Sequence, residues 1–298
     1  MPESGPSLDC PWCGASLRDG ERLPGRIRCP ACGVASADQW PSSAELDRAY
    51  AGPYRPATGR FSGLGDALLR RMRSSLAGRI DRIAPPGPVL DVGAGDGALL
   101  DALRRHGREA IGLERSSTRS DVTARDLTEL DGSWAAIVLW HSLEHLPEPA
   151  AALERAAALL APGGVLIVAV PNSASLQARA FGERWFALDP PRHLIHLTSR
   201  SLTSRLRDLG LRVERVSYLR GGQVLFGWLD GLVGVLPGHP GLYDAIRRPQ
   251  ARFRPLSGGR RAATLVAAVL LAPVAFAACA VEVAARRGGT VYVEARAA

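Results

Sequence analysis

Val89-Leu-Asp-Val-Gly-Ala-Gly-Asp-Gly97 is the stretch of this sequence that decides the fold. Its first four residues are apolar except for Asp91, which is typical of a short buried strand, and the glycines that follow open a helix expected to end at Gly107. A glycine loop of this kind brings backbone N–H groups and a helix N-terminus against a ligand, because no side chain blocks the approach. The stretch therefore predicts a ligand-binding turn after the first strand of an α/β sheet.

The segments on either side of this loop alternate between strand and helix patterns. An arginine-rich amphipathic helix is expected before it, over residues 64–83, with a solvated arginine face. Alternation of this kind predicts a doubly wound, mostly parallel sheet with helices on both faces. After the loop we expect strands at 110–113, 136–139, 165–170 and 211–219 and helices at 149–160 and 201–209.

The charges in the loop distinguish two classes of ligand. The loop also fits the dinucleotide pattern GxGxxG/A, and Glu114 lies 21 residues after Gly93, where a ribose-binding acid belongs. Asp91 and Asp96, however, would place carboxylates beside the pyrophosphate of a dinucleotide, which costs electrostatic energy. S-adenosylmethionine carries a sulfonium and an ammonium group and no phosphate. The sequence therefore favours this methyl donor, and a methyltransferase over a nicotinamide-dependent dehydrogenase.

Two motifs resemble those of the class I S-adenosylmethionine-dependent methyltransferases. Val89–Gly97 looks like their first motif, and Trp140-His-Ser-Leu-Glu-His-Leu-Pro147 is similar to the WHxLEHLP segment of the ubiquinone-biosynthesis-type branch, methyltransferase types 11 and 23. The resemblance covers about residues 8–54 and 86–220. It implies a Rossmann-like, seven-stranded sheet in which the last strand, expected at 290–295, is antiparallel.

The resemblance also implies which residues bind the donor. Glu114 looks like the acid that grips both ribose hydroxyls, and Asp126-Leu127 looks like the adenine-contacting pair. One departure is that only residues 116–121 separate the Glu114 strand from the next, so the usual intervening helix is nearly lost. We expect the donor to contact Asp91, Gly93, Gly95, Gly97, Glu114, Asp126, Leu127 and Trp140.

Four of the five cysteines form a second motif near the N-terminus, Cys10-Pro-Trp-Cys13-Gly and Cys29-Pro-Ala-Cys32-Gly. Each CPxCG turn aims two thiolates at one point. The first residues show no charged-then-apolar secretory signal, so we expect a reducing cytoplasm, where such cysteines bind metal more often than they form disulfides or a redox pair. We therefore expect a structural zinc ribbon in which the protein supplies all four ligands. Phe181–Trp185 and Leu188–Thr198 resemble segments of a bacterial subgroup that often carries such a ribbon.

Histidines follow two of the expected strands and are candidates for a catalytic base. Methyl transfer to a hydroxyl requires removal of its proton, and histidine suits that task near neutral pH. His141 follows the fourth strand, and His193 and His196 lie in the long segment 173–198 after the next one. We expect this segment to be a substrate lid and one of the three histidines to be the base. The alternative is that they only hydrogen-bond the lid to the core, and His145 is open to the same two interpretations. Aromatic residues available to wall the pocket are Phe181, Trp185 and Phe186.

The C-terminal part contains an apolar, arginine-rich insert, residues 221–287. Residues 262–281 carry no charge, and arginines cluster before them and follow them at Arg286-Arg287. Twenty apolar residues can span a bilayer, but the strand expected at 290–295 must return to the sheet. Two interpretations stay open: an in-plane or re-entrant membrane element, kinked at Pro273, whose arginines meet anionic headgroups, or a buried helix that completes the substrate pocket.

The amino-acid composition excludes some of the remaining classes of function. The net charge is +8, and all 37 basic residues are arginine, which excludes a GxxxxGK[ST] phosphate loop and a Schiff-base lysine. An RNA- or DNA-modifying methyltransferase is the main alternative, but Leu139–Ser142 stands where an NPP[YF] motif would lie. We expect a small-molecule acceptor (a sugar, a polyprenyl-linked or another lipid-like compound), O-methylation, and a cytoplasmic location, which is peripheral or monotopic at the inner face of the cell membrane if the insert is a membrane element. The expected division is 1–36 zinc ribbon, 37–84 linker and helix, 85–220 methyltransferase core, 221–287 insert and 288–298 final strand.

Overall fold

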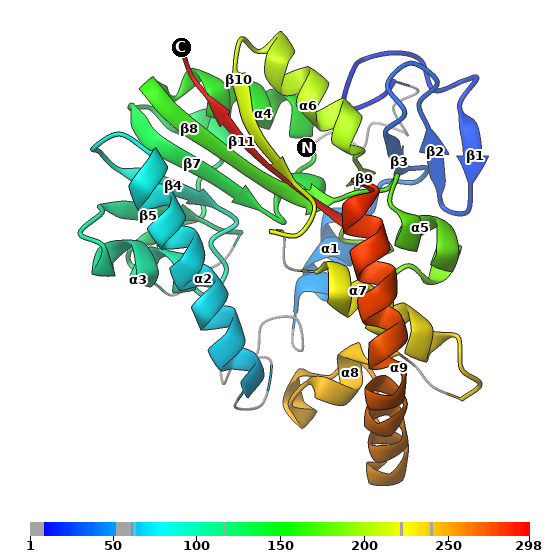
Figure 1. Cartoon of the computed structure of the whole chain (residues 1–298). Helices are drawn as coiled ribbons and strands as arrows, with labels where there is room; N and C mark the ends of the chain where they lie inside the picture. The colour runs from blue at the N-terminus through cyan, green and yellow to red at the C-terminus, as the bar shows by residue number, and fades with distance from the viewer. Residues whose placement is uncertain are drawn as a thin grey trace.

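The computed structural model describes residues 9–51, 61, 64–115, 117, 119–220, 223–238 and 241–298. Its centre is a seven-stranded sheet of strand order β10-β11-β8-β7-β4-β5-β6 (Figure 1). Neighbouring strands from β8 to β6 are parallel, and β11 is antiparallel to both β8 and β10. The bounds are Val89–Val92 (β4), Ala110–Leu113 (β5), Val122–Thr123 (β6), Trp134–Trp140 (β7), Leu160–Pro171 (β8), Arg212–Ser217 (β10) and Thr290–Arg296 (β11). The mostly parallel sheet with an antiparallel last strand is confirmed.

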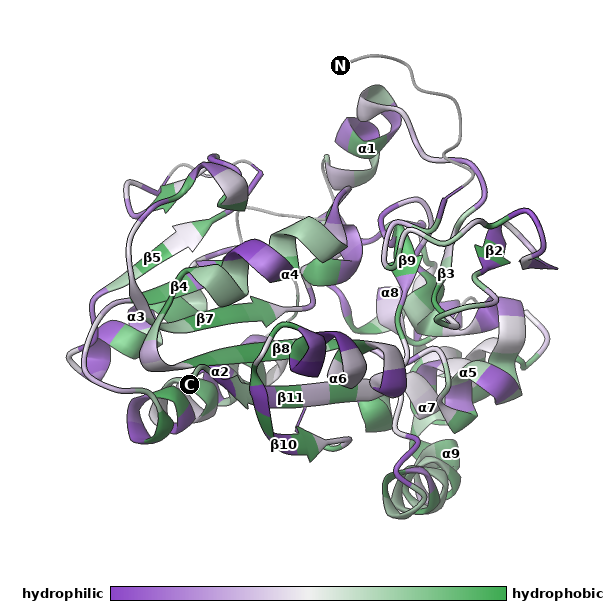
Figure 2. Ribbon diagram, turned by 90° about the horizontal axis from the view of Figure 1, so that it is seen from above, coloured by the Kyte–Doolittle hydropathy of each residue, from purple (hydrophilic) through white to green (hydrophobic). Residues whose placement is uncertain are grey.

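Helices cover both faces of this sheet, and successive strand residues point to opposite faces. Val138 and Ile167 pack with the helices α2 (Leu64–Ile83) and α3 (Ala98–Arg105) on one face. Ile137 and Leu166 pack with α4 (Pro149–Ala158) and α6 (Ser199–Asp208) on the other. Coverage on both sides explains the uninterrupted apolar run of β8, and the hydropathy colouring in Figure 2 shows β7 and β8 as apolar strands between the helices.

A smaller sheet joins the N-terminal cysteine segment to the core. Its strand order is β1-β2-β3-β9, with β1 at Glu21–Leu23, β2 at Arg26–Arg28, β3 at Ala35–Ala37 and β9 at Ile195–His196. β3 and β9 are antiparallel and pair Ala35 with His196. Trp12 and Leu17 are buried in the same core as α4 and α6. The cysteine segment is thus built into the fold through a strand of the predicted lid.

The segment read as a linker contains a helix, α1 (Ser43–Tyr50). Its N-terminus is fixed by a capping box: the Ser42 hydroxyl accepts from the Glu45 N–H, and the Glu45 carboxylate accepts from the Ser42 N–H. Trp40, just before this helix, is half-buried, and Tyr54 lies outside the described residues.

The predicted lid and insert are largely helical. The lid contains α5 (Leu176–Phe181), and the insert contains α7 (Val224–Gly234), α8 (Tyr243–Ile246) and α9 (Gly258–Ala284). α9 is one helix with Pro273 inside it. Of the described helices, α9 alone is long and apolar enough to cross a membrane, judged by length and composition.

Candidate active site

The glycine loop after β4 lies close to the segment after β7. Gly93 has φ 83°, and a Cβ added there would lie 2.6 Å from the Cβ of Ser142. Gly97, the N-cap of α3, has φ 75°, and an added Cβ would lie 2.6 Å from Nε of Arg119. Both positions therefore require glycine for conformation and for space. The Asp96 carboxylate accepts from the Ala98 N–H in the first turn of the helix.

Asp91 gives this loop a buried acid. Burial raises the pKa of Asp91 to about 7; Arg73 opposes the rise, and the carboxylates of Glu114 and Asp96 add to it. The carboxyl groups of Asp91, Glu114 and Asp96 therefore influence one another at the carboxyl end of β4. A buried carboxylate beside two others is a poor neighbour for a pyrophosphate and a good one for a cation.

The residues expected to bind the donor lie after β5, β6 and β7. Glu114 Oε2 accepts from the Gly95 N–H at 2.9 Å, which joins the β5 end to the loop. Trp140 ends β7, with the Arg73 guanidinium 5.3 Å from its ring centre. Asp126 caps the turn Leu127–Glu129, because its Oδ1 accepts from the Thr128 N–H and hydroxyl. Glu114, Trp140 and the loop are brought together, whereas the Asp126 carboxylate has a local capping role.

A buried carboxylate, Glu144, lies at the centre of the histidines. Its Oε1 is 3.3 Å from Nδ1 of His141 and 3.9 Å from Nε2 of His193. Burial would raise the pKa of Glu144, but the hydrogen bond with His141 and the charges of His141, His145 and His193 hold it at about 2. Glu144 is therefore ionised and stabilises positive charge on the neighbouring imidazoles.

His193 is oriented as a base. Its Nδ1 lies 2.8 Å from the carbonyl oxygen of Ala187. A carbonyl oxygen only accepts, so Nδ1 carries the proton and Nε2 has a lone pair when the ring is neutral. Nε2 is 3.7 Å from Oδ2 of Asp189. Two carboxylates, Glu144 and Asp189, thus face the nitrogen that would take up a proton.

The other three histidines differ in their surroundings. His141 adopts φ 52°, a conformation that costs a non-glycine residue energy and is concentrated at functional sites. Burial lowers the pKa of His145 to about 4 and that of His196 to about 3, and the charge of His193 adds to both shifts. Within the described residues, the buried atoms His196 Nδ1 and Glu144 Oε2 have no hydrogen-bond partner. The structure brings His141, His145 and His193 around Glu144, with His196 beside His193 at 6.3 Å between ring centres.

Helix α1 completes the site and was missed as an element in the sequence. The Tyr50 hydroxyl lies 2.9 Å from Nδ1 of His145, and the Ala49 carbonyl accepts from Arg192. Asp47 forms an ion pair with Arg115, the neighbour of Glu114. α1 therefore connects the Glu114 edge with the histidine cluster. The capping-box pattern Ser42-x-x-Glu45 is the sequence signal that could have revealed it.

The aromatic residues of the lid pack on the insert rather than around an open pocket. Phe181 contacts Trp228, and Phe186 contacts Phe226 and Tyr243, with ring centres 5.1–5.2 Å apart. The Trp185 indole N–H donates to Gln177. These contacts tie the segment that carries Asp189 and His193 to α7 and α8.

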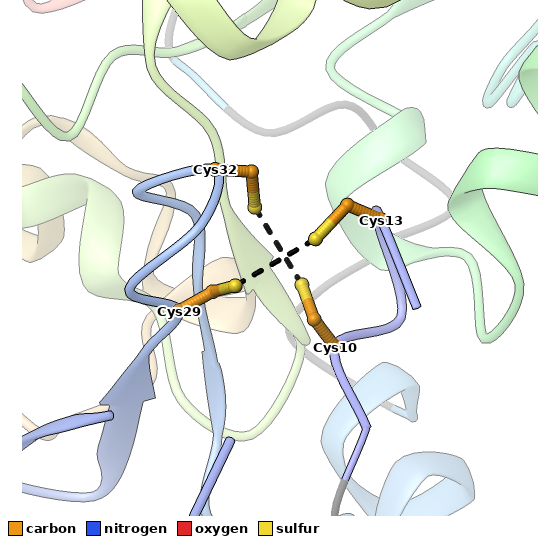
Figure 3. A group of neighbouring side chains, drawn as sticks. All are labelled: Cys10, Cys13, Cys29 and Cys32. Atoms are coloured by element: carbon orange, nitrogen blue, oxygen red, sulfur yellow. Dashed lines mark hydrogen bonds between the residues drawn. The ribbon is translucent and has the colours of Figure 1, made fainter. Parts of the chain in front are cut away.

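Among the residues that the structure describes, two groups of side chains could hold a metal ion. The four cysteines lie together (Figure 3), with Sγ–Sγ distances of 3.7 Å between Cys10 and Cys32 and 3.6 Å between Cys13 and Cys29. A tetrahedral ZnS₄ centre with 2.3 Å bonds has sulfur atoms about 3.8 Å apart, so the cysteines fit zinc. The second group is Glu144, His145 and His193, whose ligand atoms lie within 4.8 Å of one another.

Comparison with known proteins agrees with this geometry. Residues 68–216, half of the chain, match the family described as methyltransferase domain. The ubiquinone biosynthesis O-methyltransferase of Xanthomonas campestris pv. campestris is 29% identical over 161 residues, which cover 46% of this chain and 67% of that protein.

Solved structures with the same type of domain are more distant. An S-adenosylmethionine-dependent methyltransferase from Archaeoglobus fulgidus is 17% identical with a TM-score of 0.42, over 79% of this chain and 100% of that one. Mycolic acid cyclopropane synthase is also 17% identical, with a TM-score of 0.45 over 79% and 86% of the two chains. The strand order, the antiparallel β11 and the family match, rather than these scores, identify the fold. The chain belongs to the methyltransferase-domain family and is an S-adenosylmethionine-dependent methyltransferase.

Proposed function

We propose that the chain transfers the methyl group of S-adenosylmethionine to an oxygen of a small-molecule acceptor (a sugar, a polyprenyl-linked or another lipid-like compound), with His193 as the base. The observation that carries this proposal is the orientation of His193, whose Nδ1–H is held by Ala187 while Nε2 faces Glu144 and Asp189. The O-methyltransferase named among the relatives supports oxygen as the acceptor atom.

The chemistry requires alignment and one proton transfer. The acceptor oxygen attacks the methyl carbon in line with the sulfonium, so that the O–CH₃ bond forms as the S–CH₃ bond breaks and the thioether leaves without a proton. Nε2 of His193 takes the hydroxyl proton, and Glu144 and Asp189 stabilise the imidazolium until it passes the proton to water. Gly93 and Ser142 are in contact, which places His141 and the cluster next to the donor loop.

Replacing His193 tests the base. In His193→Asn we expect kcat to fall by about 10²–10⁴-fold while the affinity for S-adenosylmethionine is retained. The measurement is turnover with the acceptor, together with calorimetric titration of the donor. His106→Asn is the matched control because His106 is an exposed residue at the end of α3. Unchanged turnover in His193→Asn would transfer the role to His141 or His196, each tested by the same substitution.

Donor binding should depend on pH through Asp91. Because the pKa of Asp91 is raised to about 7, its carboxyl group is protonated below that pH and ionised above it. The ionised form attracts the cationic donor, so the affinity should increase as pH rises from about 6 to about 8, by up to about tenfold. Calorimetry across this range measures the effect. The rise should vanish in Asp91→Asn. In Asp96→Asn, which removes an exposed carboxylate of the same loop, it should persist with its midpoint at a lower pH, because the Asp96 charge contributes to the raised pKa of Asp91.

We further propose that Cys10, Cys13, Cys29 and Cys32 bind structural zinc and that the protein works in the cytoplasm at an anionic membrane surface. A nucleic-acid acceptor is disfavoured, because the outer edge of β3 is paired with β9 and Trp12 and Leu17 pack into the core. We therefore propose that the ribbon stabilises the fold of the enzyme.

A further inference from the structure

The polarity of the two faces of α9 is the reverse of that in an amphipathic helix of a globular protein. Its buried side chains are small or polar, whereas its exposed ones are large and apolar. Buried are Thr264, Ala268, Ala275, Cys279 and Glu282. Exposed by 54–73% are Val266, Val269, Leu270, Val274, Phe276 and Val281. At 100° per residue the exposed set forms one continuous stripe along the helix.

The C-terminal end of α9 is fixed to the enzyme by a buried carboxylate. Glu282 accepts hydrogen bonds from the backbone and side-chain N–H groups of Gln177 and from the indole N–H of Trp228, at 2.8–2.9 Å. Gly227 in α7 permits the close approach of Gln177, since an added Cβ would lie 2.0 Å from its Oε1. These hydrogen bonds hold the polar face of α9 inward.

The N-terminal end is fixed to the same body. Arg261 donates to the carbonyl of Ala245 in α8 at 2.9 Å. The segment after α8 is in turn attached to the start of α2, because Arg248 donates to the Phe61 carbonyl and pairs with Asp66. Both ends of α9 therefore lie on one folded unit, which excludes a crossing that would place them on opposite sides of a bilayer.

Arginine side chains lie near both ends of the exposed apolar stripe of α9. Exposed arginines lie before α9 at Arg254, in its first turn at Arg260, and after it at Arg286 and Arg287. The helix is 27 residues long, about 40 Å, and Figure 1 shows it along one side of the molecule with its N-terminal half reaching beyond the sheet. Arginine at both ends of an apolar stripe complements the anionic headgroups of one leaflet.

We propose that α9 lies in the plane of an anionic membrane, with the stripe Val266–Val281 in the acyl boundary of one leaflet and the flanking arginines at the headgroups. The membrane orientation of α9 rests on the proposed function in one respect, because it says where the enzyme would meet a lipid-like acceptor. The Gln177 side-chain N–H donates to Glu282, and the Trp185 indole N–H donates to Gln177, so Gln177 connects the membrane-facing helix with the segment that carries His193.

Sedimentation of the full chain with vesicles tests the surface, and neither donor nor acceptor is needed. We expect the protein to bind phosphatidylglycerol-containing vesicles and to be released by salt, with weak binding to phosphatidylcholine alone. Val269→Glu/Leu270→Glu should lower the partition coefficient at least about tenfold, because both side chains leave the acyl boundary. Ile111→Glu, at a half-exposed apolar residue of β5, should bind like the wild type.

The orientation is tested with Leu270→Trp and brominated lipids. Bromines near the headgroup should quench the new fluorescence more than bromines at the chain ends. Strongest quenching at the bilayer centre would overturn the in-plane orientation. Equal vesicle binding by Val269→Glu/Leu270→Glu, or oligomerisation of the wild type through this face without vesicle binding, would overturn the membrane surface and leave the proposed methyl transfer untouched.

Discussion

Cys29→Ser should release the zinc proposed for the cysteine cluster and lower turnover roughly 100-fold or more, because this segment holds a strand next to the proposed base and small displacements there are costly. β3 begins six residues after Cys29 and pairs with β9, which places Ala35 opposite His196. Structural zinc contributes about 10–16 kcal/mol to the folding of small zinc modules. Without it, β3 would lose its order, and β9 would become an unpaired strand beside His193.

Zinc analysis, thermal unfolding and turnover measured on the same preparation check this result. Cys279→Ser is the matched control, since Cys279 is buried in α9 and is not part of the four-cysteine cluster. Donor affinity should change much less than turnover in Cys29→Ser, because the glycine loop follows β4 in the main sheet. Wild-type protein that contains no zinc and is fully active would contradict the prediction.

Glu114→Ala should weaken S-adenosylmethionine binding by roughly 100-fold or more, since the two charge-assisted hydrogen bonds proposed between its carboxylate and the ribose hydroxyls would contribute about 1.5–3 kcal/mol each. In the structure Glu114 Oε2 also accepts from Gly95, so the substitution additionally loosens the loop. Calorimetric titration with the donor and with its demethylated product measures the loss.

Glu109→Ala is the appropriate comparison for this change. Glu109 is an exposed carboxylate just before β5, at the opposite end of the same strand. It should bind the donor like the wild type. Equal donor affinity in Glu114→Ala and Glu109→Ala would remove Glu114 from the binding site.

Strands and helices of the core were predictable because burial imposes a regular pattern on them. β8 is apolar on both faces, and α2 was expected with the bounds that the structure shows, Leu64–Ile83. The loop residues around Gly93 were predictable from the glycines themselves, because the turn after β4 has positive φ at Gly93, Gly95 and Gly97. Local chemistry determines these features.

Long-range contacts could not be derived in this way. Nothing near Ala35 in the sequence indicates that β3 pairs with β9, and nothing near Tyr50 indicates its contact with His145, 95 residues away. The role of Glu144 could not be predicted either. In the sequence it is one residue of the WHxLEHLP-like motif, whereas in the structure it is buried at the centre of the histidine cluster. The role of α9 stayed open because a run of Ala, Val and Leu is equally compatible with a protein core and a lipid surface.

The position of β11 has a consequence for biosynthesis. It separates β8 from β10 and pairs with both, yet it follows the whole insert in the chain. Until β11 has left the ribosome, the facing edges of β8 and β10 remain unpaired and the seven-stranded sheet cannot be completed. Helix α9 therefore emerges from the ribosome before the catalytic domain has folded completely. Membrane association during translation would thus precede the folding of the complete enzyme.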